Sequence, residues 1–385
     1  MDIKHKRLMV GKKLLLLCVL LVIVIAGTSC VKGLYPIGWS GGAVSEDTLF
    51  VGSKEGSLVA VNIDEESRRW SEPLKASGGG AGFGCLPAGG GCGGGGAAGV
   101  AIYGTPAVAG DLVYLGGYNG KIYAFNSASL EVRWVYPREK NLEPIVGGPS
   151  VAHGKVYIGG SDGKVYALDS ATGDKQWEFA TGDKIWSTPA IEGDTLYIGS
   201  FDNKLYALDA ADGSLRWEFA TEGAIAAPPL VYDGTVYIGS FDKHLYAISA
   251  ADGRLKWKFM GENWFWAQPI VYGDTIYAGC LDGKVYALNA GSGNKIAEFD
   301  LKSSVAASPV LVNSSIVFAS HEGVLYKLDA ETNRIKQLAD IEEDVLGPLC
   351  TSEGIVYIHT QDLTLHRVNA ETGAVMMSVS LGSKE

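Results

Sequence analysis

One segment of this chain recurs eight times, most often at a spacing of 40 residues. Each copy contains an Asp, Asn or Ser followed by a turn, and five copies carry a tryptophan eight residues further on: Trp70, Trp134, Trp177, Trp217 and Trp257. Three other copies keep the frame but have Ala297, Gln337 or Met377 at that place. A fixed period of this size indicates units that cannot bury their own faces and must stack on their neighbours.

Each copy reads as four short β-strands. In the fourth copy, residues 188–191, 195–200, 204–208 and 215–219 are rich in β-branched and aromatic side chains, and turn signals such as Asp202-Asn203 separate them. No helical periodicity follows the N-terminal region. Four strands in about 40 residues form one blade of a β-propeller. We therefore predict an all-β fold, an eight-bladed β-propeller of four-stranded antiparallel blades, over residues 39–385.

The turn residues and the tryptophans are predicted to be structural. Asp169 and Asp209 can accept hydrogen bonds from the backbone N–H groups of the turns that follow them. Gly173 and Gly213 supply backbone conformations that other residues resist. The five tryptophans have a fixed place on the outer strand, so we expect them to pack against a neighbouring blade.

The recurring pattern Tyr-Ile-Gly-Ser-x-Asp-Gly-Lys-x-Tyr-Ala-Leu-Asp, followed by the turn and Trp, resembles the PQQ-type repeat family. The resemblance covers residues 39–379, nearly all of the chain beyond its N-terminal region. A single ring of eight such repeats on an exported chain is similar to the BamB family, which helps β-barrel assembly in the outer membrane. The resemblance implies a monomeric ring that acts as a protein-interaction scaffold with partners in the cell envelope.

The N-terminal region is typical of an export signal. Five basic residues precede the apolar stretch 14–27, and Thr28, Ser29 and Cys30 follow. The stretch is shorter than the roughly 20 residues of a membrane span. Cys30 after small residues resembles a lipobox, although Gly27 stands where that motif usually has Leu. We predict a lipoprotein-type signal at 1–29, lipid attachment at Cys30 and a tether at 30–38; a retained N-terminal anchor is the alternative.

The net charge and the positions of the histidines and cysteines limit the partners and sites that we expect. The formal net charge of −11 disfavours nucleic acid and anionic membrane surfaces as the main partner. The histidines are scattered over different repeats, so no metal site is predicted. Cys280 and Cys350 lie in predicted strands as small buried residues. Cys85 and Cys92 lie in the Gly-rich insertion 77–99, where a local disulfide is a hypothesis; the insertion is either passive or a cover over one face.

Large apolar side chains are predicted to gather on one face over repeats four to six. The last-to-first connections and the second-to-third hairpins open on the same side, and one position in each connection should ring the mouth of the central channel: Trp39, Tyr103, Val146, Trp186, Ala226, Trp266, Ala306 and Leu346. Trp264 and Phe265 adjoin Trp266, while Phe201 and Phe241 precede hairpin turns. Gathered aromatics suggest a docking patch. The alternative is that they plug the channel as core.

Three functional classes remain open. The first is the scaffold, and the second is a surface receptor for a small or saccharide ligand at the aromatic mouth. The third is a quinoprotein dehydrogenase with PQQ and Ca²⁺, whose family has a vicinal Cys pair that this chain lacks. Asp183, Glu222 and Glu262 lie near the mouth, where an acidic rim is more often solvated than catalytic. No catalytic grouping or phosphate-binding loop stands out, so we expect a scaffold with no enzymatic activity and no cofactor.

Overall fold

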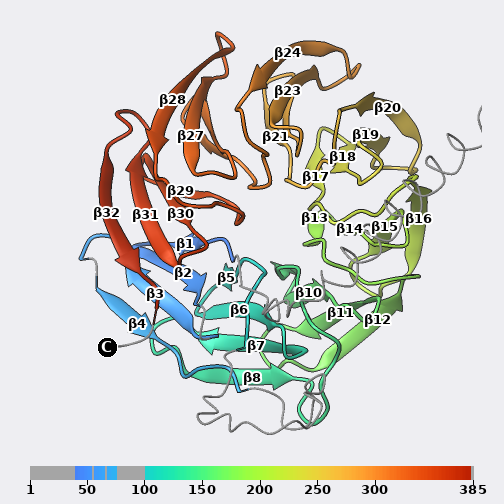
Figure 1. The fold of residues 1–385 in the computed structure, drawn as a ribbon. Helices are drawn as coiled ribbons and strands as arrows, with labels where there is room; N and C mark the ends of the chain where they lie inside the picture. Colours follow the sequence, from blue (N-terminus) through green and yellow to red (C-terminus); the bar gives the residue numbers. More distant parts are fainter. Residues whose placement is uncertain (1–39, 54–55, 66, 76–99, 383–385) are drawn as a thin grey trace, which may run out of the picture. The chain divides into compact units, whose positions relative to one another are not determined.

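The computed structural model describes residues 40–53, 56–65, 67–75 and 100–382. In these residues the chain forms eight four-stranded antiparallel sheets, each built from four consecutive strands. Figure 1 shows the sheets following one another around a ring. The predicted eight-bladed β-propeller is therefore confirmed. The signal at 1–29, the tether at 30–38, Trp39, Cys30 and the insertion 77–99 with Cys85 and Cys92 lie outside the described residues.

The first four blades contain the strands β1 (Ala43–Ser45), β2 (Thr48–Gly52), β3 (Leu58–Asn62), β4 (Arg68–Trp70); β5 (Ala107–Ala109), β6 (Leu112–Gly117), β7 (Lys121–Asn126), β8 (Val132–Tyr136); β9 (Ser150–Ala152), β10 (Lys155–Gly159), β11 (Lys164–Asp169), β12 (Lys175–Ala180); and β13 (Ala190–Glu192), β14 (Thr195–Gly199), β15 (Lys204–Asp209), β16 (Leu215–Ala220).

The last four blades contain the strands β17 (Leu230–Tyr232), β18 (Thr235–Gly239), β19 (His244–Ser249), β20 (Leu255–Met260); β21 (Ile270–Tyr272), β22 (Thr275–Gly279), β23 (Lys284–Asn289), β24 (Lys295–Asp300); β25 (Val310–Val312), β26 (Ser315–Ala319), β27 (Val324–Asp329), β28 (Arg334–Asp340); and β29 (Cys350–Ser352), β30 (Ile355–His359), β31 (Thr364–Asn369), β32 (Val375–Ser380).

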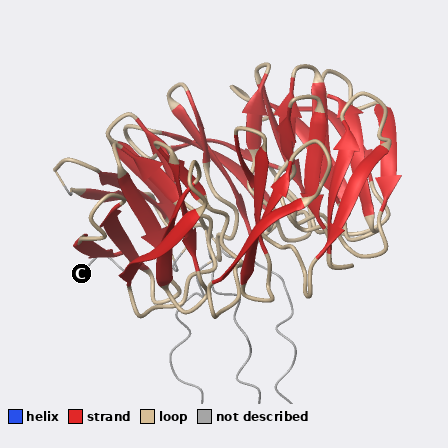
Figure 2. Cartoon of the chain, turned by 90° about the horizontal axis from the view of Figure 1, so that it is seen from above, coloured by secondary structure: helices blue, strands red, loops and turns tan. Residues whose placement is uncertain are grey.

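Both faces of each blade are buried, which is why one repeat cannot fold alone. In β15, Leu205 and Ala207 pack into a core shared with blade 5, whereas Tyr206 and Leu208 pack into a core shared with blade 3. Alternating side chains on a strand point to opposite faces of its sheet. The core is therefore a series of apolar layers between blades. The described residues in Figure 2 are all strands or loops.

Among the strands of the described residues, the first and last blades meet without exchanging a strand. The last sheet consists of β29 to β32 only, and the first strand of blade 1 contacts the first strand of blade 8. An apolar layer joins the two blades, with Leu49 and Val59 on one side and Tyr357 and Leu365 on the other. No helix in the described residues is long and apolar enough to cross a membrane.

A repeated contact, here called the tryptophan latch, joins neighbouring blades. The indole N–H of Trp177 in blade 3 donates to the carbonyl of Ala210 in blade 4 at 3.2 Å, and the hydroxyl of Tyr157 donates to the same carbonyl at 2.9 Å. The indole ring lies against Gly213, whose φ is +78° and where an added Cβ would approach the ring to 2.6 Å. Only glycine fits such a position. Trp134, Trp217 and Trp257 make the same contact.

The turns before these tryptophans have the expected geometry. Asp169 accepts hydrogen bonds from the backbone N–H groups of Ala171 and Thr172, and Asp209 accepts one from that of Ala211. In blades 2 to 6 the register of the two outer strands shifts by one residue after the turn. This β-bulge sets which face each following side chain takes, because side chains alternate along a strand.

Candidate functional site

The mouth of the channel is lined by the residues that the repeat frame predicts. Seven of the eight expected positions lie in the described residues, and all seven border one hollow on the axis of the ring: Tyr103, Val146, Trp186, Ala226, Trp266, Ala306 and Leu346. The hollow has a volume of about 80 Å³. The mouth is therefore narrow, and Trp186 and Trp266 are its bulkiest members over blades 4 to 6.

Five aromatic side chains form one connected group beside this mouth, which we call the aromatic cluster: Trp186, Phe201, Phe241, Trp264 and Trp266. Trp186 contacts Phe201 edge-on at 4.6 Å between ring centroids, and Phe201 contacts Phe241 at 5.7 Å. Phe241 stacks on Trp264 at 4.4 Å and on Trp266 at 5.4 Å. Trp264 is 41% exposed and the other four are half-buried. The cluster thus reaches solvent across blades 4 to 6.

Phe265 does not belong to this surface, which corrects its place in the predicted binding set. It is 1% exposed and packs in the layer between blades 5 and 6. The equivalent residues of other blades, Ile185, Ile225 and Val305, are also fully buried. Burial alternates along this loop, because the buried Phe265 lies between Trp264, which is 41% exposed, and Trp266, which is half-buried. The column of aliphatic residues at this position was the sequence signal for a core residue.

Tyr103 is also more buried than a binding residue needs to be. It is 5% exposed, and its ring contacts that of Tyr118 at 5.4 Å. Burial raises the pKa of Tyr103, so the phenol stays protonated. Tyr103 therefore forms part of the channel wall rather than of the aromatic cluster.

Charged side chains lie around the aromatic cluster. The Lys184 amine lies 4.7 Å from the centroid of the Trp186 ring and 4.5 Å from that of Phe201, within cation–π range. Asp183, Glu222 and Glu262 are exposed, and Glu262 pairs with Lys284 at 3.0 Å.

The loops that carry the cluster are clamped by carboxylates of the adjoining hairpins. Asp202 accepts hydrogen bonds from the Tyr206 hydroxyl and from the backbone N–H of Gly182, both at 2.6 Å. Two equivalent clamps hold the next loops through Asp242 and Asp282. Burial and the bond to Asp202 raise the pKa of Tyr206, which keeps its hydroxyl a donor. These carboxylates are structural.

A second hollow extends the cluster towards blade 7. It has a volume of about 230 Å³ and is lined by Trp266, Leu281, Ser304, Ala306, His321 and Leu346. Trp266 borders both this hollow and the axial one. The aromatic cluster is therefore continuous with a recess beside blade 7.

No group of three or more His, Cys, Asp or Glu side chains gathers as possible metal ligands within the described part of the chain. Cys280 is buried and Cys350 is half-buried, and neither forms a disulfide. Burial raises the pKa of the Cys280 thiol to about 12, so it remains an unreactive thiol.

Two family models of β-propeller proteins match parts of this chain. A family model described as "Beta-alanine-activating enzyme, beta-propeller" matches residues 143–384, and one described as "Outer membrane protein assembly factor BamB" matches residues 30–185. A search of curated proteins gives no match.

Two solved structures illustrate the likeness. BamB from Moraxella catarrhalis is 20% identical with a TM-score of 0.68, over 83% of this chain and 93% of that one. The computationally designed Ika8 protein is 14% identical with a TM-score of 0.67, over 84% of this chain and 93% of the designed one. At such identities the likeness concerns the fold alone.

Proposed function

We propose that this chain is a non-enzymatic protein-interaction scaffold. It belongs to the propeller family described as "Beta-alanine-activating enzyme, beta-propeller", and it is a PQQ-like propeller of the BamB type. The aromatic cluster is the docking surface of the scaffold. The partners are proteins of the cell envelope, and assembly of outer-membrane proteins is the setting that the second family description suggests.

The observation that carries this proposal is the contact chain from Trp186 to Trp266. Aromatic anchors that cluster at the centre of an interface dominate binding energies. Trp264 exposes two-fifths of its surface while stacked on Phe241, so its apolar face is available to a partner without any rearrangement of the core. Exposed apolar area gathered in this way marks interaction sites.

The size of the mouth favours a protein partner over a small ligand. Pockets for small ligands typically measure about 300–1,000 Å³. The axial hollow of about 80 Å³ and its neighbour of about 230 Å³ both fall below that range. A receptor for a saccharide at the aromatic mouth is therefore the weaker of the two candidates.

The absence of enzymatic activity is part of the proposal. The first family description names an enzyme, but it refers to the propeller of that enzyme. In this chain the rim carboxylates are exposed, and the carboxylates that are more enclosed, such as Asp202, are committed to clamping loops. This arrangement supports a binding surface rather than an acid–base pair. We propose no PQQ and no other cofactor.

Export and anchoring complete the proposal. Residues 1–29 direct export, lipid on Cys30 tethers the ring through residues 30–38, and the ring faces the periplasm or the exterior. Cys85 and Cys92 can pair in that oxidising compartment. Replacement of Cys30 by Ser should move the protein from the membrane fraction to the soluble fraction after cell breakage. Retention in the membrane with Met1 still present would support the uncleaved anchor instead.

The docking proposal is tested by affinity capture from envelope extract. Trp264→Ala combined with Trp266→Ala should weaken capture of the specific partners at least about thirtyfold. The matched control is Leu215→Ala with Leu255→Ala, since these side chains are about as exposed as Trp264 but lie on the outer strands of blades 4 and 5. Unchanged capture by the tryptophan variant would contradict the proposal. Quenching of tryptophan fluorescence that is blocked by free saccharides would support the receptor.

A further inference from the structure

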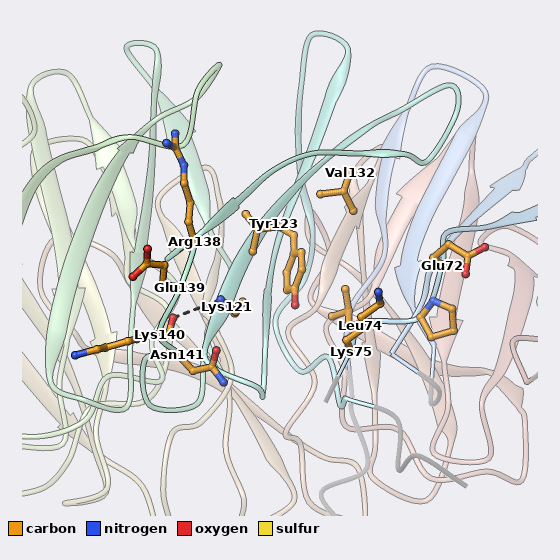
Figure 3. Close-up of a pocket in the computed structure, with 12 residues that line it drawn as sticks. Glu72, Leu74, Lys75, Lys121, Tyr123, Val132, Arg138, Glu139, Lys140 and Asn141 are labelled. Carbon is orange, nitrogen blue, oxygen red and sulfur yellow. Dashed lines mark hydrogen bonds between the residues drawn. The ribbon is translucent and has the colours of Figure 1, made fainter. Parts of the chain in front are cut away.

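A cavity of about 720 Å³ lies between blades 1 and 2, at the outer strands and away from the channel mouth. Figure 3 shows Leu74 and Lys75 on the wall formed by blade 1, and Tyr123 and Val132 on the wall formed by blade 2. Its volume is within the usual range for pockets that enclose a small ligand or a single bound group, about 300–1,000 Å³. It shares no residue with the aromatic cluster.

The other blades show what normally fills this space. In blades 2 to 5 an aromatic residue on the outer strand lies against a tyrosine of the next blade. Phe179 contacts Tyr206 at 5.5 Å between ring centroids, and Phe259 contacts Tyr286 at 4.9 Å. Tyr136 with Tyr166 and Phe219 with Tyr246 repeat this arrangement. Tyr123 occupies the corresponding position in blade 2.

Blade 1 presents no aromatic ring to Tyr123 because its outer strand has a different register. In blade 3, Trp177 pairs with Ala167 and Phe179 with Val165. In blade 1, Trp70 pairs with Val59 without a bulge, so its side chain turns to the layer shared with blade 8.

Ser71 then takes the place of the phenylalanine. Its backbone N–H donates to the carbonyl of Leu58, which is the position equivalent to Val165. Its hydroxyl accepts from the N–H of the same residue at 2.9 Å. A small polar side chain thus replaces a ring. Leu74 and Tyr123, which are 5% and 7% exposed, pack in the layer between blades 1 and 2 and border the cavity.

The walls of the cavity are positively charged in a chain that is acidic overall. Four cationic side chains and two carboxylates line it: Lys75, Lys121, Arg138, Lys140, Glu72 and Glu139. Lys121 is held by the carbonyls of Pro137 and Lys140, and Arg138 pairs with Asp174 at 2.8 Å. Lys75 comes from blade 1 and Lys140 from the loop after β8, so exposed amines flank the cavity from both sides.

We propose that this cavity binds a peptide segment of a partner protein in which an aromatic side chain is flanked by carboxylates. The aromatic side chain enters the part of the cavity that Leu74, Tyr123 and Val132 border. The carboxylates pair with Lys75 and Lys140 on opposite walls. Aromatic contact and charge complementarity together define the ligand, since neither wall alone supplies both.

The test uses fluorescence anisotropy with the full chain and a labelled peptide of sequence Gly-Asp-Phe-Glu-Gly. The wild type should bind it more tightly than a peptide with Ala for Phe, and added salt should weaken binding. Val132→Trp, which narrows the cavity from an exposed position, should weaken binding at least about tenfold. Lys75→Glu combined with Lys140→Glu should do the same.

Each variant has a matched control. Leu215→Trp makes the same kind of change at the equivalent position of blade 4, and Lys302→Glu with Lys336→Glu makes the same charge change on exposed lysines elsewhere. Both controls should bind the peptide like the wild type. Equal binding of the Phe and Ala peptides, or unchanged binding by the Val132→Trp variant, would overturn the proposal.

Discussion

Blades 2 to 6 and blades 7, 8 and 1 share one repeat but are held to their neighbours by different contacts. From blade 2 to blade 6, each junction has a tyrosine and a tryptophan that donate to a single turn carbonyl of the next blade, as Tyr197 and Trp217 do to Ala250. From blade 6 to blade 7 only the tyrosine bond remains, from Tyr277 to Ala330 at 3.3 Å.

The other arc relies on apolar layers and on a few polar contacts. His359 of blade 8 lies 2.8 Å from the carbonyl of Ser40 at the start of blade 1, across the closing junction. Several buried polar atoms in the described part of this arc have no hydrogen-bond partner: Trp70 Nε1, His321 Nδ1, His359 Nε2 and His366 Nε2. The difference shows that the 40-residue repeat can form without the latch. Strands and turns determine the repeat, whereas the latch depends on three residue positions: the tyrosine, the tryptophan and the glycine.

The largest expected contrast is between Trp217 and Gln337, which stand at the same distance from the preceding turn in the sequence. Trp217→Ala removes a packed ring and a 3.0 Å hydrogen bond, so we expect a loss of about 3–5 kcal/mol in the free energy of unfolding. Gln337 is exposed, and Gln337→Ala should cost less than about 0.5 kcal/mol. Urea unfolding followed by circular dichroism measures both. Similar losses would mean that the latch does not distinguish the two arcs.

The glycine of the latch provides the next contrast. Gly213→Ala would bring a Cβ to 2.6 Å from the Trp177 ring at a φ of +78°, and we expect a cost of about 2–4 kcal/mol. Gly193 has a φ of +54° but open space around its Cβ position, so Gly193→Ala should cost only about 1–2 kcal/mol. Thermal unfolding of the two variants measures the difference between their costs. Equal costs would mean that the Trp177 ring does not pack closely against the turn.

Acid should weaken the closing junction. Burial lowers the pKa of His359 below its ordinary value of 6.5, so the unfolded chain takes up a proton more readily than the folded one. The contribution of neutral His359 to the free energy of unfolding is therefore fully present above about pH 6.5. It declines as the pH falls, by up to about 1.4 kcal/mol per pH unit for one histidine. His359→Gln should flatten this slope. The exposed His153 is the control, and its replacement by Gln should leave the slope intact.

The smallest contrast concerns one hydroxyl group. Tyr157→Phe removes the 2.9 Å bond to the Ala210 carbonyl and should cost about 1 kcal/mol. Tyr357 has the same place in blade 8, where no turn carbonyl accepts a hydrogen bond from it, so Tyr357→Phe should be nearly neutral. Equal effects of the two substitutions on the urea midpoint would remove the tyrosine from the latch.

Repetition made most of the fold predictable, and local register accounts for what was missed. The frame alone placed Trp186 and Trp266 at the channel mouth, where they lie. Phe265 was wrongly assigned to the binding surface because it was grouped with its aromatic neighbours. The equivalent residues of other blades are aliphatic and buried, which indicated a core position. The reversed direction of Trp70 depends on a missing β-bulge, which is a matter of backbone hydrogen bonding that the tryptophan spacing does not reveal. The cavity beside Leu74 and Tyr123 lies next to that same irregular strand, and the sequence pattern did not reveal it.

The carboxylate clamps at Asp202, Asp242 and Asp282 have a thermodynamic consequence for whatever binds the aromatic cluster. Loops that are already ordered lose little conformational entropy on association, and such ordering otherwise costs about 0.5–1.5 kcal/mol for each immobilised side chain. Each clamp joins a hairpin to a neighbouring loop, so the cluster is presented as one rigid face. Under the docking proposal, a partner meets a preformed surface and loses less of its contact energy to ordering.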